Sequence, residues 1–233
     1  MKPHLLLLHG ALGSETSMEP LKALLEKDAV VHTLSFAGHG NKPASADGMR
    51  LDSLSHEILQ ALEATPADKV WLLGYSMGGY LALYTALLQH KKIAGVITLA
   101  TKMHWDPTIA AEECKKLNPE IIEQKVPKFA QYLAGVHGAD SWKPLLRETA
   151  LFLEELGQTN FLGLENLKNI SVPCCFTLGE QDTMVTVAET EAAAHAMGAA
   201  FHLVPSSEHP IEKTNVSALA TIVRDFVLQH SQS

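Results

Sequence analysis

A serine between glycines is the residue best suited to covalent chemistry in this sequence. The stretch G-Y-S-M-G at residues 74–78 has the spacing G-x-S-x-G and follows the apolar run of residues 70–73. A long apolar helical pattern comes next, so the motif predicts a sharp strand-to-helix turn that exposes the Ser76 hydroxyl. Such a hydroxyl becomes a useful nucleophile only when a base lies beside it. We therefore predict a nucleophilic serine at position 76.

Two residues later in the chain have the types and places needed to activate that serine. An acidic residue that orients a histidine base is expected, in that chain order, each just after a strand. Asp182 follows the apolar run of residues 174–178, and His209 follows the run of residues 200–204. We predict that His209 is the base and that Asp182 orients it, with Glu180 as the rival carboxylate.

Backbone N–H groups near the serine are expected to stabilise a developing negative charge. The predicted helix begins at Met77, and its first N–H groups carry the positive end of the helix dipole. A second donor is expected from the glycine-rich loop H-G-A-L-G-S at residues 9–14, with Ala11 as first choice and Leu12 as second. His9 is expected to shape this loop by hydrogen bonding and not to serve as a second base.

The elements that must position these residues alternate between short apolar runs and helical patterns. Strands are expected at residues 4–8, 30–35, 70–73, 93–99, 174–178 and 200–204. This alternation predicts an α/β fold with a mostly parallel sheet of about six strands, flanked by helices. Ligand sites in such sheets lie beyond the carboxyl ends of the strands, where the candidate serine, aspartate and histidine all fall.

Residues 102–168 break the alternation with helical patterns and several prolines. Pro127 is expected to end or kink a helix there, because proline lacks the N–H that an inner turn needs. We predict a helical cap at residues 102–168, inserted into an α/β core made of residues 1–101 and 169–233.

The cap is expected to determine the substrate. We predict substrate contacts from His104 and Trp105, just after the fourth strand, and from Trp142. The cap shows no cluster of arginine or lysine that would demand a highly anionic substrate, so an apolar acyl group is the better expectation.

Composition excludes several other classes of function. The formal net charge of -8 disfavours nucleic acid as a partner, because an acidic surface repels phosphate. The three cysteines form no zinc-binding pattern and are expected to be reduced thiols. The apolar run near the N-terminus is shorter than a usual signal sequence, and no run is long enough to span a membrane. We expect a cytoplasmic protein that acts on a small molecule; the oligomeric state stays open.

With these motifs in place, the chain resembles the α/β-hydrolase superfamily over nearly its full length. The matching motifs are L-L-L-L-H-G at 5–10, F-A-G-H-G at 36–40, G-Y-S-M-G-G at 74–79, G-E-Q-D at 179–182 and S-E-H at 207–209. The compact cap resembles those of small carboxylesterases, acyl-carrier-protein ester hydrolases and menaquinone-pathway relatives. The turn at residues 37–41 lacks the usual proline and serine, which weakens any transfer of substrate preference.

The resemblance implies a serine hydrolase that cleaves a small carboxylic ester or thioester through an acyl-enzyme intermediate. No metal or organic cofactor is required by that chemistry. Serine at position 76 argues against the superfamily branches that use an aspartate nucleophile. Two alternatives stay open: a carbon–carbon bond hydrolase or lyase with the same three residues, and a non-catalytic small-molecule receptor on the same fold.

Overall fold

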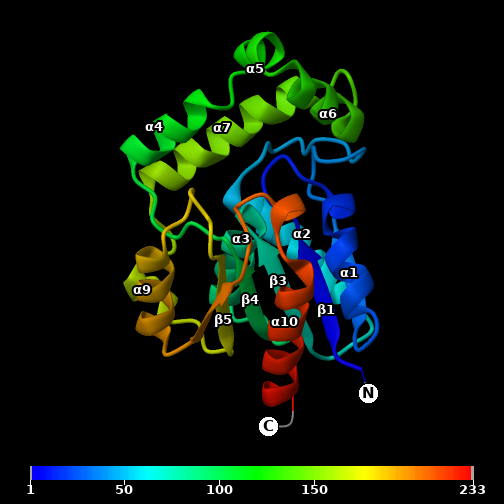
Figure 1. The fold of residues 1–233 in the computed structure, drawn as a ribbon, viewed down its shortest axis with the longest axis vertical. Helices are drawn as coiled ribbons and strands as arrows, with labels where there is room; N and C mark the ends of the chain where they lie inside the picture. The colour runs from blue at the N-terminus through cyan, green and yellow to red at the C-terminus, as the bar shows by residue number, and fades with distance from the viewer. Residues whose placement is uncertain (1, 232–233) are drawn as a thin grey trace.

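Six short aliphatic runs form one sheet in the computed structural model, which describes residues 2–231 (Figure 1). All neighbouring strands are parallel, and their order is β2-β1-β3-β4-β5-β6. The strands are β1 (His4–Leu8), β2 (Val30–Leu34), β3 (Val70–Tyr75), β4 (Ile93–Leu99), β5 (Cys174–Gly179) and β6 (Ala200–Val204). The predicted α/β fold with a six-stranded parallel sheet is confirmed.

Helices cover both faces of the sheet because its central strands are apolar on both sides. One face carries α1 (Glu19–Leu25) and α10 (Val216–His230). The other carries α2 (Leu51–Ala64), α3 (Met77–Leu87) and α9 (Val187–Met197). Two 3-10 turns, η1 (Glu15–Met18) and η2 (Ile211–Lys213), precede α1 and α10.

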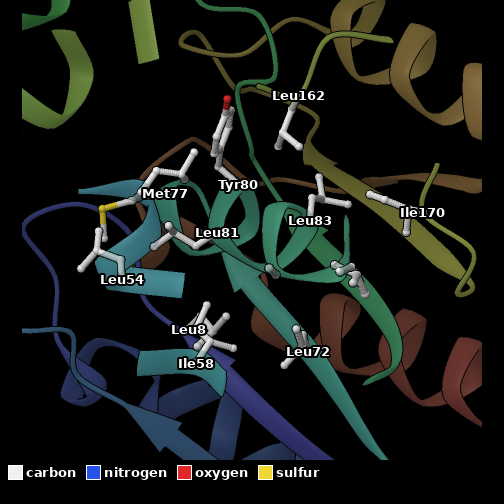
Figure 2. Packing of buried hydrophobic residues seen from close by; sticks show 14 of the residues in the cluster. Leu8, Leu54, Ile58, Leu72, Met77, Tyr80, Leu81, Leu83, Leu162 and Ile170 are labelled. Atoms are coloured by element: carbon white, nitrogen blue, oxygen red, sulfur yellow. The ribbon is translucent and has the colours of Figure 1, made fainter. Parts of the chain in front are cut away.

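The alternation of side chains along each strand divides the core into two clusters. Leu5 and Leu7 of β1 pack towards α1 and α10, whereas Leu8 packs towards α2 and α3. Figure 2 shows the cluster on the α2 and α3 face, with Leu8 and Leu72 from the sheet beneath Leu81 of α3. The neighbouring Cys174 and Cys175 of β5 likewise enter opposite clusters, and both are free thiols.

Five helices connect β4 to β5, and four of them lie beyond the carboxyl ends of the strands (Figure 1). Pro107, Pro119 and Pro127 each occupy the first position of a helix, where the missing N–H is not needed. The helices are α4 (Pro107–Lys115), α5 (Pro119–Lys125), α6 (Pro127–His137), α7 (Trp142–Gln158) and α8 (Leu164–Leu167). The last of them, α8, packs against α9 and α3. Among residues 2–231, no helix has the length and apolar character needed to cross a membrane.

Burial of the central strand generates the first prediction. Leu72 of β3 is fully buried, so Leu72→Ala is expected to lower the free energy of unfolding by about 2–5 kcal/mol through lost burial and a cavity. Leu151 on α7 is 57% exposed, and Leu151→Ala is expected to change it by less than about 0.5 kcal/mol. Urea unfolding measures both values. An equal loss of unfolding free energy in the two variants would contradict the burial of Leu72 in the centre of the sheet.

Candidate active site

Ser76 occupies a strained turn between β3 and α3. Its backbone has φ 51° and ψ −114°, a region that residues with a Cβ rarely adopt. The Ser76 N–H donates to the Leu99 carbonyl at 2.8 Å, and the Thr101 hydroxyl donates to the Ser76 carbonyl at 3.2 Å. The turn is therefore held from β4 and presents its side chain at the N-terminus of α3.

Two glycines make that turn possible. A Cβ at Gly74 would overlap the backbone of Gly78, and a Cβ at Gly78 would overlap the carbonyl oxygen of Leu8. The strand, the helix and β1 thus approach one another at a separation that only glycine permits. This packing also brings the end of β1 next to the serine.

Asp182 and His209 meet beyond the ends of β5 and β6. The His209 Nδ1–H donates to Asp182 Oδ2 at 2.8 Å, and the Asp182 side chain is fully buried. Asp182 Oδ1 accepts the N–H groups of Met184 at 2.7 Å and Val185 at 2.9 Å. Burial alone would raise the pKa of Asp182, but the hydrogen bonds from His209 and the two N–H groups outweigh it and hold the pKa below its ordinary value. The carboxylate therefore stays ionised and fixes the imidazole.

The loops that carry this pair are tied to each other. The Gln181 N–H donates to the Ser207 carbonyl at 2.8 Å. Glu180, the rival carboxylate, accepts the Ser206 N–H at 3.2 Å. Glu180 thus links the two loops, while Asp182 alone of the two carboxylates bonds to His209.

The loop after β1 lies on the other side of the serine. Its turn is closed by the Gly13 N–H, which donates to the Gly10 carbonyl at 3.1 Å, and Leu12 has a positive φ of 58°. Ala11, Leu12 and Met77 line the same cavity as Ser76. Within residues 2–231, the Ala11 and Met77 N–H groups donate to no protein acceptor. They are available to an oxyanion formed at Ser76.

His9 braces this loop from beneath. Its Nδ1–H donates to the Gly10 carbonyl at 2.8 Å, and its Nε2 accepts the Phe36 N–H at 3.1 Å. Burial lowers the pKa of His9 to about 4, so the imidazole is neutral at neutral pH and keeps both hydrogen bonds. Its contacts are those of a structural residue that supports the loop.

A cavity of about 570 Å³ joins these groups to the helices above the sheet. Ser76 and His209 both line it, and most of the other lining side chains are apolar. They come from α3, α6, α7 and the loops after β1, β4, β5 and β6. The larger apolar ones include Tyr80, Trp105, Phe129, Tyr132, Phe152, Leu153, Leu156, Met184 and Ile211.

Of the three predicted substrate contacts, only Trp105 lines the cavity. His104 and Trp142 do not line it. The His104 side chain is exposed, with its Nε2 3.6 Å from Asp106 Oδ2. Trp142 is buried among residues of α5, α6 and α7, including Leu146. A tryptophan at the first position of a helix and a histidine in a loop carry no periodic signal that tells which way they face.

Phe152 is among the candidate lining residues of the cap, but sequence reasoning missed Leu156 and Tyr80, although helical spacing places both on the cavity wall. Leu156 follows Phe152 by four residues on α7, so the two share one face of the helix. Tyr80 stands four residues after Ser76 on α3 and therefore lies on the serine's side of the helix. Both i,i+4 relations are visible in the printed sequence.

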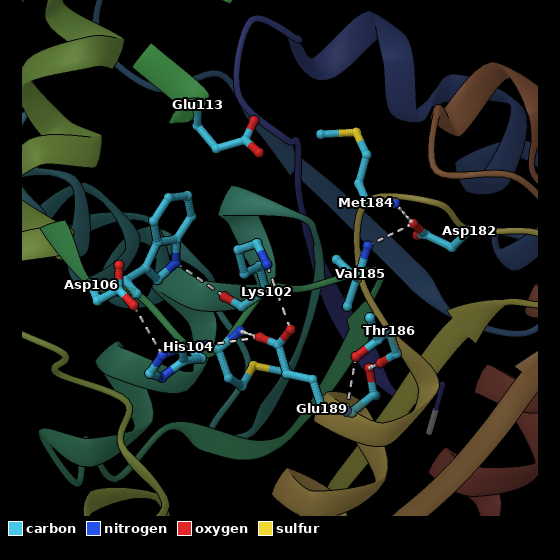
Figure 3. A network of polar contacts seen from close by, with 12 residues as sticks. Lys102, His104, Asp106, Glu113, Asp182, Met184, Val185, Thr186 and Glu189 are labelled. Atoms are coloured by element: carbon cyan, nitrogen blue, oxygen red, sulfur yellow. Dashed lines mark hydrogen bonds and ion pairs between the residues drawn. The ribbon is translucent and has the colours of Figure 1, made fainter. Parts of the chain in front are cut away.

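The segment between β4 and α4 is fixed to the core through one carboxylate. Glu189 of α9 accepts the N–H groups of Met103 at 2.7 Å and His104 at 2.8 Å, and it lies 3.6 Å from the Lys102 ammonium (Figure 3). The Trp105 indole N–H donates to the Lys102 carbonyl at 3.3 Å, which orients the ring. Together these contacts fix the position of Trp105 in the cavity wall. Among residues 2–231, no group of three or more metal-binding side chains is arranged to hold an ion.

The sequence pattern of the α/β hydrolase fold family matches residues 3–204, and the chain belongs to this family. A 2-succinyl-6-hydroxy-2,4-cyclohexadiene-1-carboxylate synthase of Yersinia enterocolitica is 27% identical over 98% of this chain and 88% of its own length. MenH from S. aureus has a TM-score of 0.80 at 19% identity, covering 98% of this chain and 94% of that one. The enol-lactonase from Burkholderia xenovorans LB400 has a TM-score of 0.79 at 18% identity, covering 98% and 92%. The likeness to these two solved structures shows the same fold.

The surroundings of Asp182 generate the second prediction. A carboxylate whose pKa is lowered on folding stabilises the folded state above its ordinary value of 3.8, and this contribution is lost as the pH falls through the lowered value. Asparagine does not titrate. We expect Asp182→Asn to be less stable than the parent protein at pH 6, with the difference shrinking towards pH 3.

Urea unfolding across this pH range measures the effect. The exposed Asp68→Asn is the matched control, expected to follow the parent protein at each pH. A constant difference between the parent and Asp182→Asn from pH 6 to pH 3 would contradict the described hydrogen bonds.

Proposed function

We propose that this chain is a serine hydrolase that cleaves a small carboxylic ester or thioester. In this proposal Ser76 is the nucleophile, His209 the general base and Asp182 the residue that orients His209. The N–H groups of Ala11 and Met77 form the oxyanion hole, with Leu12 as the alternative to Ala11. Together these are the groups that acyl transfer to water requires.

The observation that carries the proposal is the hydrogen bond between His209 and Asp182 beside the cavity that Ser76 lines. Because the ionised carboxylate accepts the proton on Nδ1, the imidazole has its lone pair on Nε2. That nitrogen is the one a serine base needs.

The reaction would proceed in two halves. The Ser76 oxygen bonds to the acyl carbon while its proton passes to His209 Nε2, and the carbonyl oxygen takes negative charge against the two N–H groups. His209 then protonates the departing alcohol or thiol, leaving an acyl ester on Ser76. In the second half His209 takes a proton from water, the hydroxide attacks the ester, and Ser76 recovers its proton as the acid leaves.

The cavity wall favours a neutral, apolar acyl group. Two lysines line it, but Lys116 is hydrogen-bonded to Glu113 at 2.8 Å and Lys102 lies against Glu189. Each positive charge is thus matched by a carboxylate, so the wall offers little net attraction to an anion. Most of the other lining side chains are apolar, including those from α3, α6 and α7.

A lyase-type reaction is the second candidate, favoured by one specific observation. The synthase of Yersinia enterocolitica aligns with 98% of this chain. Forming or breaking a carbon–carbon or carbon–oxygen bond next to a carbonyl could use the same base and oxyanion donors. We rank it second because the charge-matched, apolar wall of this cavity favours a simple acyl group.

Removal of the nucleophile is the third prediction. Ser76→Ala is expected to lower kcat for p-nitrophenyl ester hydrolysis by about a millionfold, because the covalent step is lost. The exposed Ser217→Ala on α10 is the matched control and is expected to keep full activity. A fluorophosphonate probe should label the parent protein at Ser76 and leave Ser76→Ala unlabelled. Absence of labelling in the parent protein would instead support a non-catalytic receptor.

Substrate class is the fourth prediction. A series of p-nitrophenyl esters from acetate to decanoate is expected to give rising kcat/KM up to a chain that fills the apolar cavity, because each buried methylene adds about 0.8 kcal/mol. The lyase alternative is tested separately, by expressing this chain in a bacterial strain that lacks its 2-succinyl-6-hydroxy-2,4-cyclohexadiene-1-carboxylate synthase and measuring growth. Growth rescue together with negligible ester hydrolysis would favour the lyase and reject the esterase.

A further inference from the structure

One histidine of the cap reaches two separate loops of the core. His137 is the last residue of α6 and is only 2% exposed. Its Nε2–H donates to the Leu12 carbonyl at 3.0 Å, and its Nδ1 accepts the Gly40 N–H at 2.9 Å. A single ring therefore connects the cap with the loop after β1 and the loop after β2.

Only one protonation state of the ring can make both hydrogen bonds. A donor at Nε2 and an acceptor at Nδ1 define the neutral Nε2–H tautomer. A second proton at Nδ1 would face the Gly40 N–H and break that contact. Burial lowers the pKa of His137, which keeps the ring in the neutral form.

The groups around His137 are compatible with a neutral ring. From the loop after β2, His39 stacks edge-on against it with centroids 5.9 Å apart. His9, at the end of β1, lies beyond His39 with centroids 4.8 Å apart. Lys42, Asp140 and Glu148 line the adjoining cleft, from the loop after β2, the loop before α7 and α7 itself.

The Leu12 carbonyl belongs to the turn that supplies the candidate oxyanion donor. Leu12 has φ 58°, a conformation that is unfavourable unless surrounding contacts hold it. Within the turn only the Gly13 N–H to Gly10 carbonyl bond closes the backbone, at 3.1 Å. The hydrogen bond from His137 holds the carbonyl of the Leu12–Gly13 peptide, whose N–H makes that turn-closing bond, so the same peptide is held on both sides.

We propose that His137 is a positioning residue that couples the seating of the cap to the geometry of the oxyanion loop. The inference rests on the proposed function, because the loop matters only if an oxyanion forms at Ser76. Phe129 and Tyr132 of the same helix line the cavity, so α6 contributes to the cavity wall and to the loop at once. A substrate that contacts α6 therefore influences, through His137, the position of the N–H groups that stabilise its transition state.

Kinetics on p-nitrophenyl butyrate test this coupling. His137→Phe keeps a ring of similar size and removes both hydrogen bonds. We expect kcat to fall about 10- to 100-fold with KM within about threefold, because a misplaced donor weakens the transition state more than the bound substrate. His137→Gln, which retains a donor and an acceptor, should recover most of kcat. His195→Phe, at an exposed position on α9, is the matched control and should leave both constants unchanged.

Amide hydrogen exchange, followed by NMR, supplies a readout that does not depend on activity. In His137→Phe the Gly13 amide is expected to exchange at least about tenfold faster than in the parent protein, because the turn loses its outer support. Unchanged Gly13 exchange, or an unchanged kcat accompanied only by a lower Tm, would overturn the proposal. If the parent protein neither hydrolyses the ester nor reacts with a fluorophosphonate at Ser76, the proposed function fails, and Gly13 exchange alone then decides whether His137 positions the loop.

Discussion

The close approach of β3, α3 and β1 is the constraint on which the rest of the candidate site depends. Gly74 and Gly78 let three backbones meet where any Cβ would overlap, and Ser76 takes a positive φ as a consequence. Such a turn costs free energy, and hydrogen bonds from the Ser76 N–H to the Leu99 carbonyl and from the Thr101 hydroxyl to the Ser76 carbonyl hold it in place. The cost is consistent with a site where the position of one hydroxyl matters more than local stability.

The remaining groups reach that hydroxyl because parallel strands all end at the same edge of the sheet. β5 and β6 deliver Asp182 and His209, and the Gln181 to Ser207 hydrogen bond keeps their loops together. β1 delivers the turn that contains Ala11. These strands are hydrogen-bonded to their neighbours in one sheet, which fixes the points from which the loops start.

The helices beyond the strand ends are attached to the core by polar contacts to backbone groups. Glu189 holds the segment between β4 and α4, and His137 holds the end of α6. Glu155 of α7 accepts the Leu51 N–H at 3.2 Å, at the N-terminus of α2. Side chains that satisfy buried backbone groups in this way fix orientation, because an unmade hydrogen bond at these positions is costly. The cavity wall is therefore held in place around Ser76 and His209.

The sequence by itself determined the local elements and the chemistry-bearing positions. Strands His4–Leu8, Ile93–Leu99 and Ala200–Val204 follow from short apolar runs, and the turn at Ser76 follows from its glycines, because neighbouring residues control both. Only the tertiary structure decided where isolated side chains point: His104 faces solvent, and Trp142 packs among α5, α6 and α7. It also decided that His137 bonds to Leu12 across 125 positions of the chain. Such a contact depends on how two segments far apart in the sequence pack together, and no local pattern of residues specifies that packing.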